Sequence, residues 1–264
     1  MINRRENEKR RTTPEQEQSE GILEGRNAVT EALKNGRTID KLYVASGDTD
    51  ADLARLCARA KAAGIVIVTA DRRKLDQMSV THAHQGVIAQ VAAHDYVTVD
   101  EILAYARQRG EEPLLVICDE LSDPHNLGAI LRTAECAGAH GVIIPKRRSV
   151  GLTAVVAKAS AGAVEYMKVA RVTNIAATIR SLKEKGVWVY GTAADGASPL
   201  YQTDLRGASA IVIGNEGDGM SRLVAESCDL KISIPMKGRI SSLNASAAAA
   251  ILLYEAVRQR NTNQ

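Results

Sequence analysis

The chain has 264 residues, of which 45% are hydrophobic and 25% charged, and its formal net charge is +3. This composition predicts a globular protein of two domains, and because no apolar run approaches eighteen residues, a membrane-spanning helix is not expected. The polar N-terminus does not resemble a secretory signal and the four cysteines form no Cys-x-x-Cys pair, so we expect a cytoplasmic protein without disulfides or structural zinc.

The first twenty residues are almost wholly polar and include several arginines. We expect a disordered basic tail there, either a simple solvated segment or an arm that gathers RNA phosphates. Residues 21–94 then alternate helical patterns with short Val/Ile-rich strands, which predicts a small α/β domain. Its expected helices are 27–35, 51–63 and 72–78, and its expected strands are 41–45, 65–69 and 86–92.

Residues 95–112 are expected to link this domain to a second one over 113–264, and they contain a helical pattern at 99–109. Near-continuous apolar strands separated by amphipathic helices predict a parallel sheet covered on both faces. Ligands of such sheets bind beyond the carboxyl ends of the strands. The expected strands are 114–118, 141–144, 187–190, 210–213 and 230–234, and the expected helices are 127–137, 152–158, 175–185, 220–226 and 245–260.

Three polar segments lie where an expected strand passes into a helix. The first is residues 123–134, Asp-Pro-His-Asn-Leu-Gly-Ala-Ile-Leu-Arg-Thr-Ala. Asn126 stands where an N-cap is expected, and Arg132 follows Gly128 and Ala129, whose small side chains leave space beside it. Since helical side chains lean toward the N-terminus, the Arg132 guanidinium could reach back toward Asn126, although a solvent-facing arginine is the alternative.

The second segment, residues 213–220, has three glycines that could turn the backbone around a small ligand with Glu216 beside it. The third, residues 235–246, places Ser242 and Asn244 at the start of the last helix, where backbone N–H groups could hold polar ligand atoms. An ordinary surface turn and ordinary helix capping are the alternatives. The chain lacks a P-loop and the G-x-G-x-x-G spacing, so neither a P-loop NTPase nor a dinucleotide-binding fold is expected.

Together and in this order, the three strings resemble the SPOUT superfamily of RNA methyltransferases, specifically its SpoU/TrmH-type branch, which methylates a ribose 2′-hydroxyl. Residues 21–29, Gly-Ile-Leu-Glu-Gly-Arg-Asn-Ala-Val, also look like the opening of that family's L30e-like substrate-binding module. The resemblance therefore covers nearly everything after the tail. The whole chain most resembles the enzymes that methylate a guanosine ribose of 23S ribosomal RNA.

This resemblance implies a catalytic domain with a C-terminal trefoil knot, a homodimer with the active site near the subunit interface, and S-adenosylmethionine as cofactor without any metal. By motif position, the groups that would hold the cofactor are Thr192, Gly214, Ile234, Met236 and Leu243. The functional side chains carry over to Asn126, Arg132, Glu216, Ser242 and Asn244.

Large-subunit ribosomal RNA is the expected partner, with no membrane partner. Basic residues near strand ends and in the first domain are expected to contact its phosphates. These residues are Arg26, Lys146, Arg147, Arg148 and Arg239. The absence of Phe and the single Trp argue against a base-stacking sheet of the RNP type.

Methyl transfer to a ribose oxygen is an in-line displacement, so the protein must align two atoms and increase the alkoxide character of the hydroxyl. Arginine keeps its proton in proteins and is a poor base, so Arg132 either activates the hydroxyl, as the family usually assigns, or stabilises developing negative charge. Alternatives within the branch are a transfer RNA ribose methyltransferase and a ribosomal RNA methyltransferase that confers antibiotic resistance. Those of other classes are a noncatalytic RNA-binding ribosome-assembly factor and a small-molecule α/β enzyme.

Overall fold

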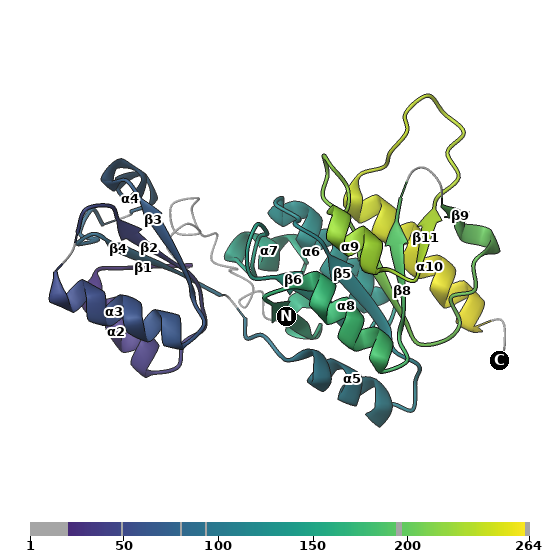
Figure 1. Cartoon of the computed structure of the whole chain (residues 1–264), viewed down its shortest axis with the longest axis horizontal. Coiled ribbons are helices and arrows are strands. Elements are labelled where there is room, and N and C mark those ends of the chain that lie inside the picture. The colour runs from purple at the N-terminus through teal and green to yellow at the C-terminus, as the bar shows by residue number, and fades with distance from the viewer. Residues whose placement is uncertain (1–20, 49, 80, 93, 194–196, 262–264) are drawn as a thin grey trace, which may run out of the picture. The chain divides into compact units, whose positions relative to one another are not determined.

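The computed structural model describes residues 21–48, 50–79, 81–92, 94–193 and 197–261. The chain divides into two compact units, Met1–Ala93 and His94–Gln264 (Figure 1). The predicted basic tail, residues 1–20, lies outside the described residues. Both units mix helices with strands, and the α/β class predicted from the sequence is confirmed.

The first unit is built on a mixed sheet. Among its described residues, four strands lie in the order β1-β4-β2-β3, with β2 and β3 parallel and β4 antiparallel to β1 and β2. The sequence pattern does not predict β1, because three residues are too few to show alternation. The elements are β1 (Ile22–Glu24), α2 (Arg26–Lys34), β2 (Ile39–Ala45), α3 (Ala51–Ala62), β3 (Val66–Ala70), α4 (Arg72–Met78) and β4 (Val87–Val91).

Helices α2 and α3 pack on one face of this sheet, and α4 lies on the other (Figure 1). Leu53 and Leu56 of α3 join Leu42 and Val87 in the larger core, whereas Leu75 of α4 is buried in a smaller cluster. Aspartates begin both α3 and α4, since the side chain at each N-cap accepts backbone N–H groups of the first turn. Among the described residues, the sheet face opposite α2 and α3 is covered by one short helix, α4.

The second unit is built on a parallel sheet. Among its described residues, seven strands lie in the order β7-β6-β5-β10-β8-β11-β9, and all of their pairings are parallel. The strands are β5 (Leu114–Cys118), β6 (Gly141–Pro145), β7 (Val169–Val172), β8 (Trp188–Thr192), β9 (Ser198–Pro199), β10 (Ser209–Ile213) and β11 (Leu230–Ser233). The α-helices are α5 (Val99–Gln108), α6 (Pro124–Cys136), α7 (Ala154–Ala159), α8 (Ile175–Glu184), α9 (Arg222–Ser227) and α10 (Ala245–Asn261), and the 3-10 helices are η1 (Ala163–Glu165) and η2 (Leu200–Gln202).

Both faces of this sheet are buried, as the sequence predicted. Successive residues of β5 point to opposite faces: Val116 joins the core formed with α6 and α10, whereas Ile117 joins the core formed with α5 and α8. Every residue of β5, β6 and β10 is buried, which explains their continuous apolar sequences. The carboxyl ends of β5, β10 and β8 therefore meet at one edge of the sheet.

Residues 95–112, expected to be a link, pack on the second unit. The backbone N–H of Val97 donates to the carbonyl of Val169 at 2.9 Å, and α5 begins with a capping box between Thr98 and Glu101. Ile102 is fully buried in that unit's core, directly against Gly141, where an added Cβ would lie 2.6 Å from the isoleucine side chain. This segment thus covers part of the sheet.

The last helix is fastened at its carboxyl end. The Arg260 guanidinium donates to the carbonyl oxygens of Glu112 (2.7 Å), Pro113 (2.9 Å) and Gly207 (2.6 Å), which satisfies carbonyls at the start of β5 and before β10. Burial lowers the pKa of Arg260.

The trefoil knot stays a prediction. Within the described residues, no helix has both the length and the apolar character that crossing a bilayer requires.

Candidate active site

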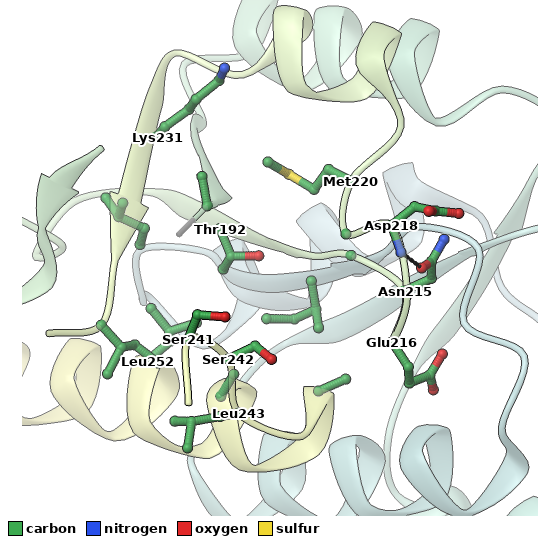
Figure 2. A pocket seen from close by; sticks show the side chains of 18 of the residues that line it. Thr192, Asn215, Glu216, Asp218, Met220, Lys231, Ser241, Ser242, Leu243 and Leu252 are labelled. Carbon is green, nitrogen blue, oxygen red and sulfur yellow. Dashed lines mark hydrogen bonds between the residues drawn. The ribbon is translucent and has the colours of Figure 1, made fainter. Parts of the chain in front are cut away.

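A cavity of about 460 Å³ opens at the carboxyl ends of β8, β10 and β11 and extends to the start of α10. The five residues predicted to hold a cofactor all line it: Thr192, Gly214, Ile234, Met236 and Leu243. In Figure 2, Thr192 at the end of β8 lies on one side of it, the neighbouring Ser242 and Leu243 before α10 lie on another, and Glu216 is also on its wall. The structure thus brings these segments together, while contact with a cofactor stays a prediction.

One wall of the cavity is the glycine-rich turn after β10. A Cβ added to Gly214 would lie 2.3 Å from the backbone carbonyl carbon of Gly219, so only glycine allows the turn to fold back this closely. The Asn215 side-chain oxygen accepts the backbone N–H groups of Gly217 (2.9 Å) and Asp218 (2.7 Å) and holds the turn closed (Figure 2). This role was not predicted from the sequence, although an asparagine beside a glycine is typical of such turns.

Three of the predicted functional side chains form a continuous hydrogen-bonded chain. Asn126 Nδ2 donates to Glu216 Oε1 at 2.7 Å, and Asn244 Nδ2 donates to Asn126 Oδ1 at 2.8 Å. The direction is determined chemically, because the Asn244 oxygen is occupied by the backbone N–H of Ser246 (2.9 Å) and a carboxylate of Glu216 can only accept. These two hydrogen bonds join side chains that are far apart in the sequence: Asn126 and Glu216 are separated by 90 positions, and Asn126 and Asn244 by 118.

The start of α6 differs from the prediction. Asp123, not Asn126, is the N-cap: its carboxylate accepts the backbone N–H of His125 at 2.8 Å, and Pro124 occupies the first turn. The prediction of an N-cap at Asn126 is therefore wrong. Asn126 lies within the first turn and is 6% exposed. Because its side chain does not cap the helix, its amide is available to bind Glu216 and Asn244. At the start of α10, Asn244 does cap the helix, as one of the expected alternatives proposed.

Arg132 is exposed on α6 and is not among the residues that line the cavity. Within the described part of the chain its side chain has no ion-pair or hydrogen-bond partner. The space predicted beside it at Gly128 is filled, since a Cβ there would lie 2.4 Å from the Cβ of Ala159 in α7. Gly128 thus permits close packing of α6 on α7.

The residues predicted to contact RNA have different environments. Lys146, Arg147 and Arg148 follow the carboxyl end of β6, and Arg148 forms an ion pair with Glu120 at 3.3 Å. Arg239 is exposed in the segment between β11 and α10. In the first unit, the Arg26 guanidinium forms a 2.7 Å ion pair with Asp50. Their contacts with RNA stay predictions.

A buried carboxylate beside the glycine-rich turn has a role that the sequence pattern did not predict. Asp119, directly after β5, is 3% exposed and its carboxylate accepts the backbone N–H of Ser221 at 2.7 Å, which fixes the segment that leads into α9. Its position directly after a buried strand was the sequence feature that could have indicated this role.

Burial, with smaller contributions from the carboxylates of Asp119 and Glu216, raises the pKa of Cys118 to about 12. Burial likewise raises the pKa of Cys228 to about 11, so neither thiol supplies a thiolate nucleophile at neutral pH.

Comparison with known proteins identifies both units. Residues 113–254 match the SpoU rRNA Methylase family, and residues 22–97 match the domain family described as RNA 2′-O ribose methyltransferase substrate binding. YacO of Bacillus subtilis, whose name places it in the TrmH family of tRNA/rRNA methyltransferases, is 51% identical over 237 residues, which are 90% of this chain and 95% of YacO.

Solved structures share the fold. An AdoMet-bound rRNA methyltransferase of Sinorhizobium meliloti aligns with a TM-score of 0.57 and 27% identity over 90% of this chain and 87% of its own. The SpoU methyltransferase AviRb of Streptomyces viridochromogenes, in complex with AdoMet, aligns with a TM-score of 0.59 and 24% identity over 95% of each chain. With the catalytic unit and the substrate-binding unit both matched, the chain belongs to the SpoU family of RNA methyltransferases.

Proposed function

We propose that this protein transfers a methyl group from S-adenosylmethionine to a ribose 2′-hydroxyl of RNA. The observation that carries the proposal is the hydrogen-bonded chain of Glu216, Asn126 and Asn244 at the edge of the cavity. A noncatalytic RNA-binding protein would not require three separate segments to present these side chains together. The family assignment and the AdoMet-bound S. meliloti relative support the same reaction.

The cavity fits a nucleoside-sized cofactor. Its volume lies in the range of about 300–1,000 Å³ that is usual for small-molecule sites, and its lining combines apolar side chains with backbone groups. Ile234, Met236 and Leu243 would pack on the cofactor, and the backbone at Gly214 would hold its polar edge. When bound, S-adenosylmethionine supplies an electrophilic methyl group.

The chain's own residues align the acceptor and shape its charge. Asn126 connects the turn that carries Glu216 to Asn244, which directly follows Ser242 and Leu243 of the cavity wall. Arg132, positively charged and free of protein partners among the described residues, would bind the nucleotide and stabilise negative charge that develops on the 2′-oxygen. The proton then leaves to water or to a phosphate.

We further infer that the substrate is a guanosine of 23S ribosomal RNA, modified in the cytoplasm during rRNA processing and ribosome biogenesis. The S. meliloti rRNA methyltransferase aligns over both units, which supports ribosomal RNA over transfer RNA. Transfer RNA remains the second candidate, because the name of the Bacillus relative includes both RNAs.

A homodimer and a C-terminal trefoil knot belong to the same proposal. Helix α10 is apolar around most of its circumference, yet Ala247 and Tyr254 are exposed on one side of it, with Tyr254 51% exposed. An apolar helix face of this kind is usually covered. Sedimentation analysis should give a dimer for the wild type and a monomer for Tyr254→Glu, while the control Tyr201→Glu, changed at an exposed tyrosine on η2, should stay dimeric. Dimers in both variants would contradict this use of α10.

The function is tested with the purified protein, tritiated S-adenosylmethionine, and ribosomal and transfer RNA from a strain that lacks the gene. We expect incorporation into ribosomal RNA, mapped by ribose-methylation sequencing to one guanosine. Arg132→Ala should abolish transfer and leave cofactor affinity within a few-fold by calorimetry. Incorporation only into transfer RNA would redirect the assignment, and full turnover by Arg132→Ala would refute the role of this arginine.

A further inference from the structure

The start of α4 in the first unit carries three consecutive basic residues, Arg72, Arg73 and Lys74, which spread around its exposed side, and we call this exposed side the α4 basic face. All three side chains belong to exposed residues. Over the part of the chain that the structure describes, none of the three forms an ion pair with a carboxylate. The local charge is therefore not neutralised by the protein.

Three other basic residues of the same unit are paired with carboxylates, whereas Arg59 and Lys61 of α3 form no ion pair over the described part of the chain and are part of the control below. Arg26 pairs with Asp50 at 2.7 Å, Lys34 with Glu31 at 2.8 Å and Arg55 with Asp52 at 3.5 Å. The Arg26 guanidinium also donates to the backbone carbonyl of Gln85 at 3.2 Å. To bind a phosphate, Arg26 would have to give up these contacts, whereas the residues of the α4 basic face would lose no protein ion pair.

The carboxylates closest in sequence to the α4 basic face are already engaged. Asp71 accepts the backbone N–H of Lys74 at 2.8 Å as the N-cap of α4. Asp76 lies 2.9 Å from Nε2 of His84, whose other ring nitrogen accepts the backbone N–H of Gly86 at 3.0 Å. Because His84 Nδ1 is an acceptor, its Nε2 carries the proton and donates to Asp76.

An aromatic side chain lies beside one of these charges, that of Lys74. Lys74 Nζ is 5.9 Å from the centre of the Tyr43 ring, and Tyr43 is only partly buried on the sheet face that α4 covers. Burial raises the pKa of Tyr43. On the same face Tyr43 has Ile88 and Val68 as its register neighbours. Unpaired cations beside an aromatic ring match the sugar–phosphate backbone and the exposed bases of single-stranded RNA.

We propose that the α4 basic face, with Tyr43, is the surface by which the first unit binds the RNA substrate. The inference rests on the proposed function for its ligand, and it assigns the contact to a different part of the unit from Arg26. RNA is favoured over an acidic protein because three exposed cations on consecutive residues can contact several phosphates of one strand, and each such contact releases condensed counterions.

The test neutralises charges on two faces of one unit. Arg72→Gln, Arg73→Gln and Lys74→Gln are combined in one variant, and Arg55→Gln, Arg59→Gln and Lys61→Gln on α3 form a matched control with the same change of charge. All six residues are exposed, and α3 and α4 lie on opposite faces of the sheet (Figure 1). Affinity for ribosomal RNA is measured by filter binding over a range of salt concentrations, with cofactor affinity and thermal unfolding alongside.

The α4 variant should bind RNA about tenfold or more weakly, and its slope of log Kd against log salt should fall by about 2 to 3, which corresponds to three lost phosphate contacts. Its KM for RNA should rise with kcat unchanged, and each single Gln variant should lower the slope by about one. The α3 control should behave as wild type. Equal weakening by both variants, or wild-type RNA binding by the α4 variant, would overturn the proposal, the latter leaving an acidic protein as the partner. The binding assay does not depend on methyl transfer. If the wild type methylates no RNA, that result contradicts only the proposed function, and the binding assay still tests the α4 basic face.

Discussion

Replacing Asn126 by aspartate isolates the link between the first turn of α6 and the glycine-rich turn. The new carboxylate keeps an oxygen that accepts from Asn244, but it loses the N–H that donates to Glu216 Oε1 at 2.7 Å. Two unit charges at that separation repel by about 6 kcal/mol at an effective dielectric of 20 and by about 1.5 kcal/mol in bulk water. Because Glu216 is exposed and Asn126 is buried, we expect about 2–4 kcal/mol of destabilisation at pH 7.5.

The penalty should depend on pH with a defined sign. Repulsion raises the pKa of the carboxyl pair in the folded variant above its unfolded value, so the folded state binds the additional proton and the stability of the variant falls as pH rises through that interval. Urea unfolding at pH 5 and pH 7.5 can be followed through Trp188, the single tryptophan, which reports on the second unit. The variant should approach wild-type stability at pH 5.

A second substitution supplies the control. Adding Glu216→Gln to Asn126→Asp exchanges the amide and the carboxylate and preserves both the net charge and one charge-assisted hydrogen bond. We expect the double variant to recover to within about 1 kcal/mol of wild type and to regain part of the methyl-transfer rate that the single variant loses. A single variant as stable as wild type at pH 7.5, or a double variant without recovery, would refute the assigned role of this contact.

Three further predictions concern the cavity and the second unit. Gly214→Ala places a Cβ 2.3 Å from the backbone of Gly219 and should weaken S-adenosylmethionine binding at least about tenfold, measured by calorimetry; unchanged affinity would contradict the cavity assignment. Burial lowers the pKa of His140, so wild-type stability should fall as pH drops below about 6.5, and His140→Asn should flatten that dependence in urea unfolding at several pH values; an unaltered profile would exclude this histidine as its source. Arg260→Met removes hydrogen bonds to four backbone carbonyls, those of Glu112, Pro113, Leu205 and Gly207, and one to Ser209 Oγ, and it should cost about 2–4 kcal/mol by Trp188 fluorescence; a loss below about 0.5 kcal/mol would show that the fastening is redundant.

Local sequence patterns predicted most helices and strands, because burial determines which positions of each element are apolar. The strand at 114–118 and the helix at 72–78 have the predicted bounds. The pattern failed for β7, where Arg171 interrupts the apolar residues, and for β9, which has only two residues. It also misplaced the start of α6, although a proline directly after Asp123 favours that aspartate as the N-cap.

The sequence by itself determined the succession of strands and helices, the need for glycine in the turn after β10, and the polar side chains at strand ends. Only the tertiary structure decided which of these side chains meet. Asn126 contacts Glu216 and Asn244 because β10 lies beside β5 in the sheet and α10 packs on α6, an order that no local periodicity encodes. It also decided that Arg26 is held by Asp50, because the balance between an ion pair and a free charge depends on which residues the fold brings within a few ångströms.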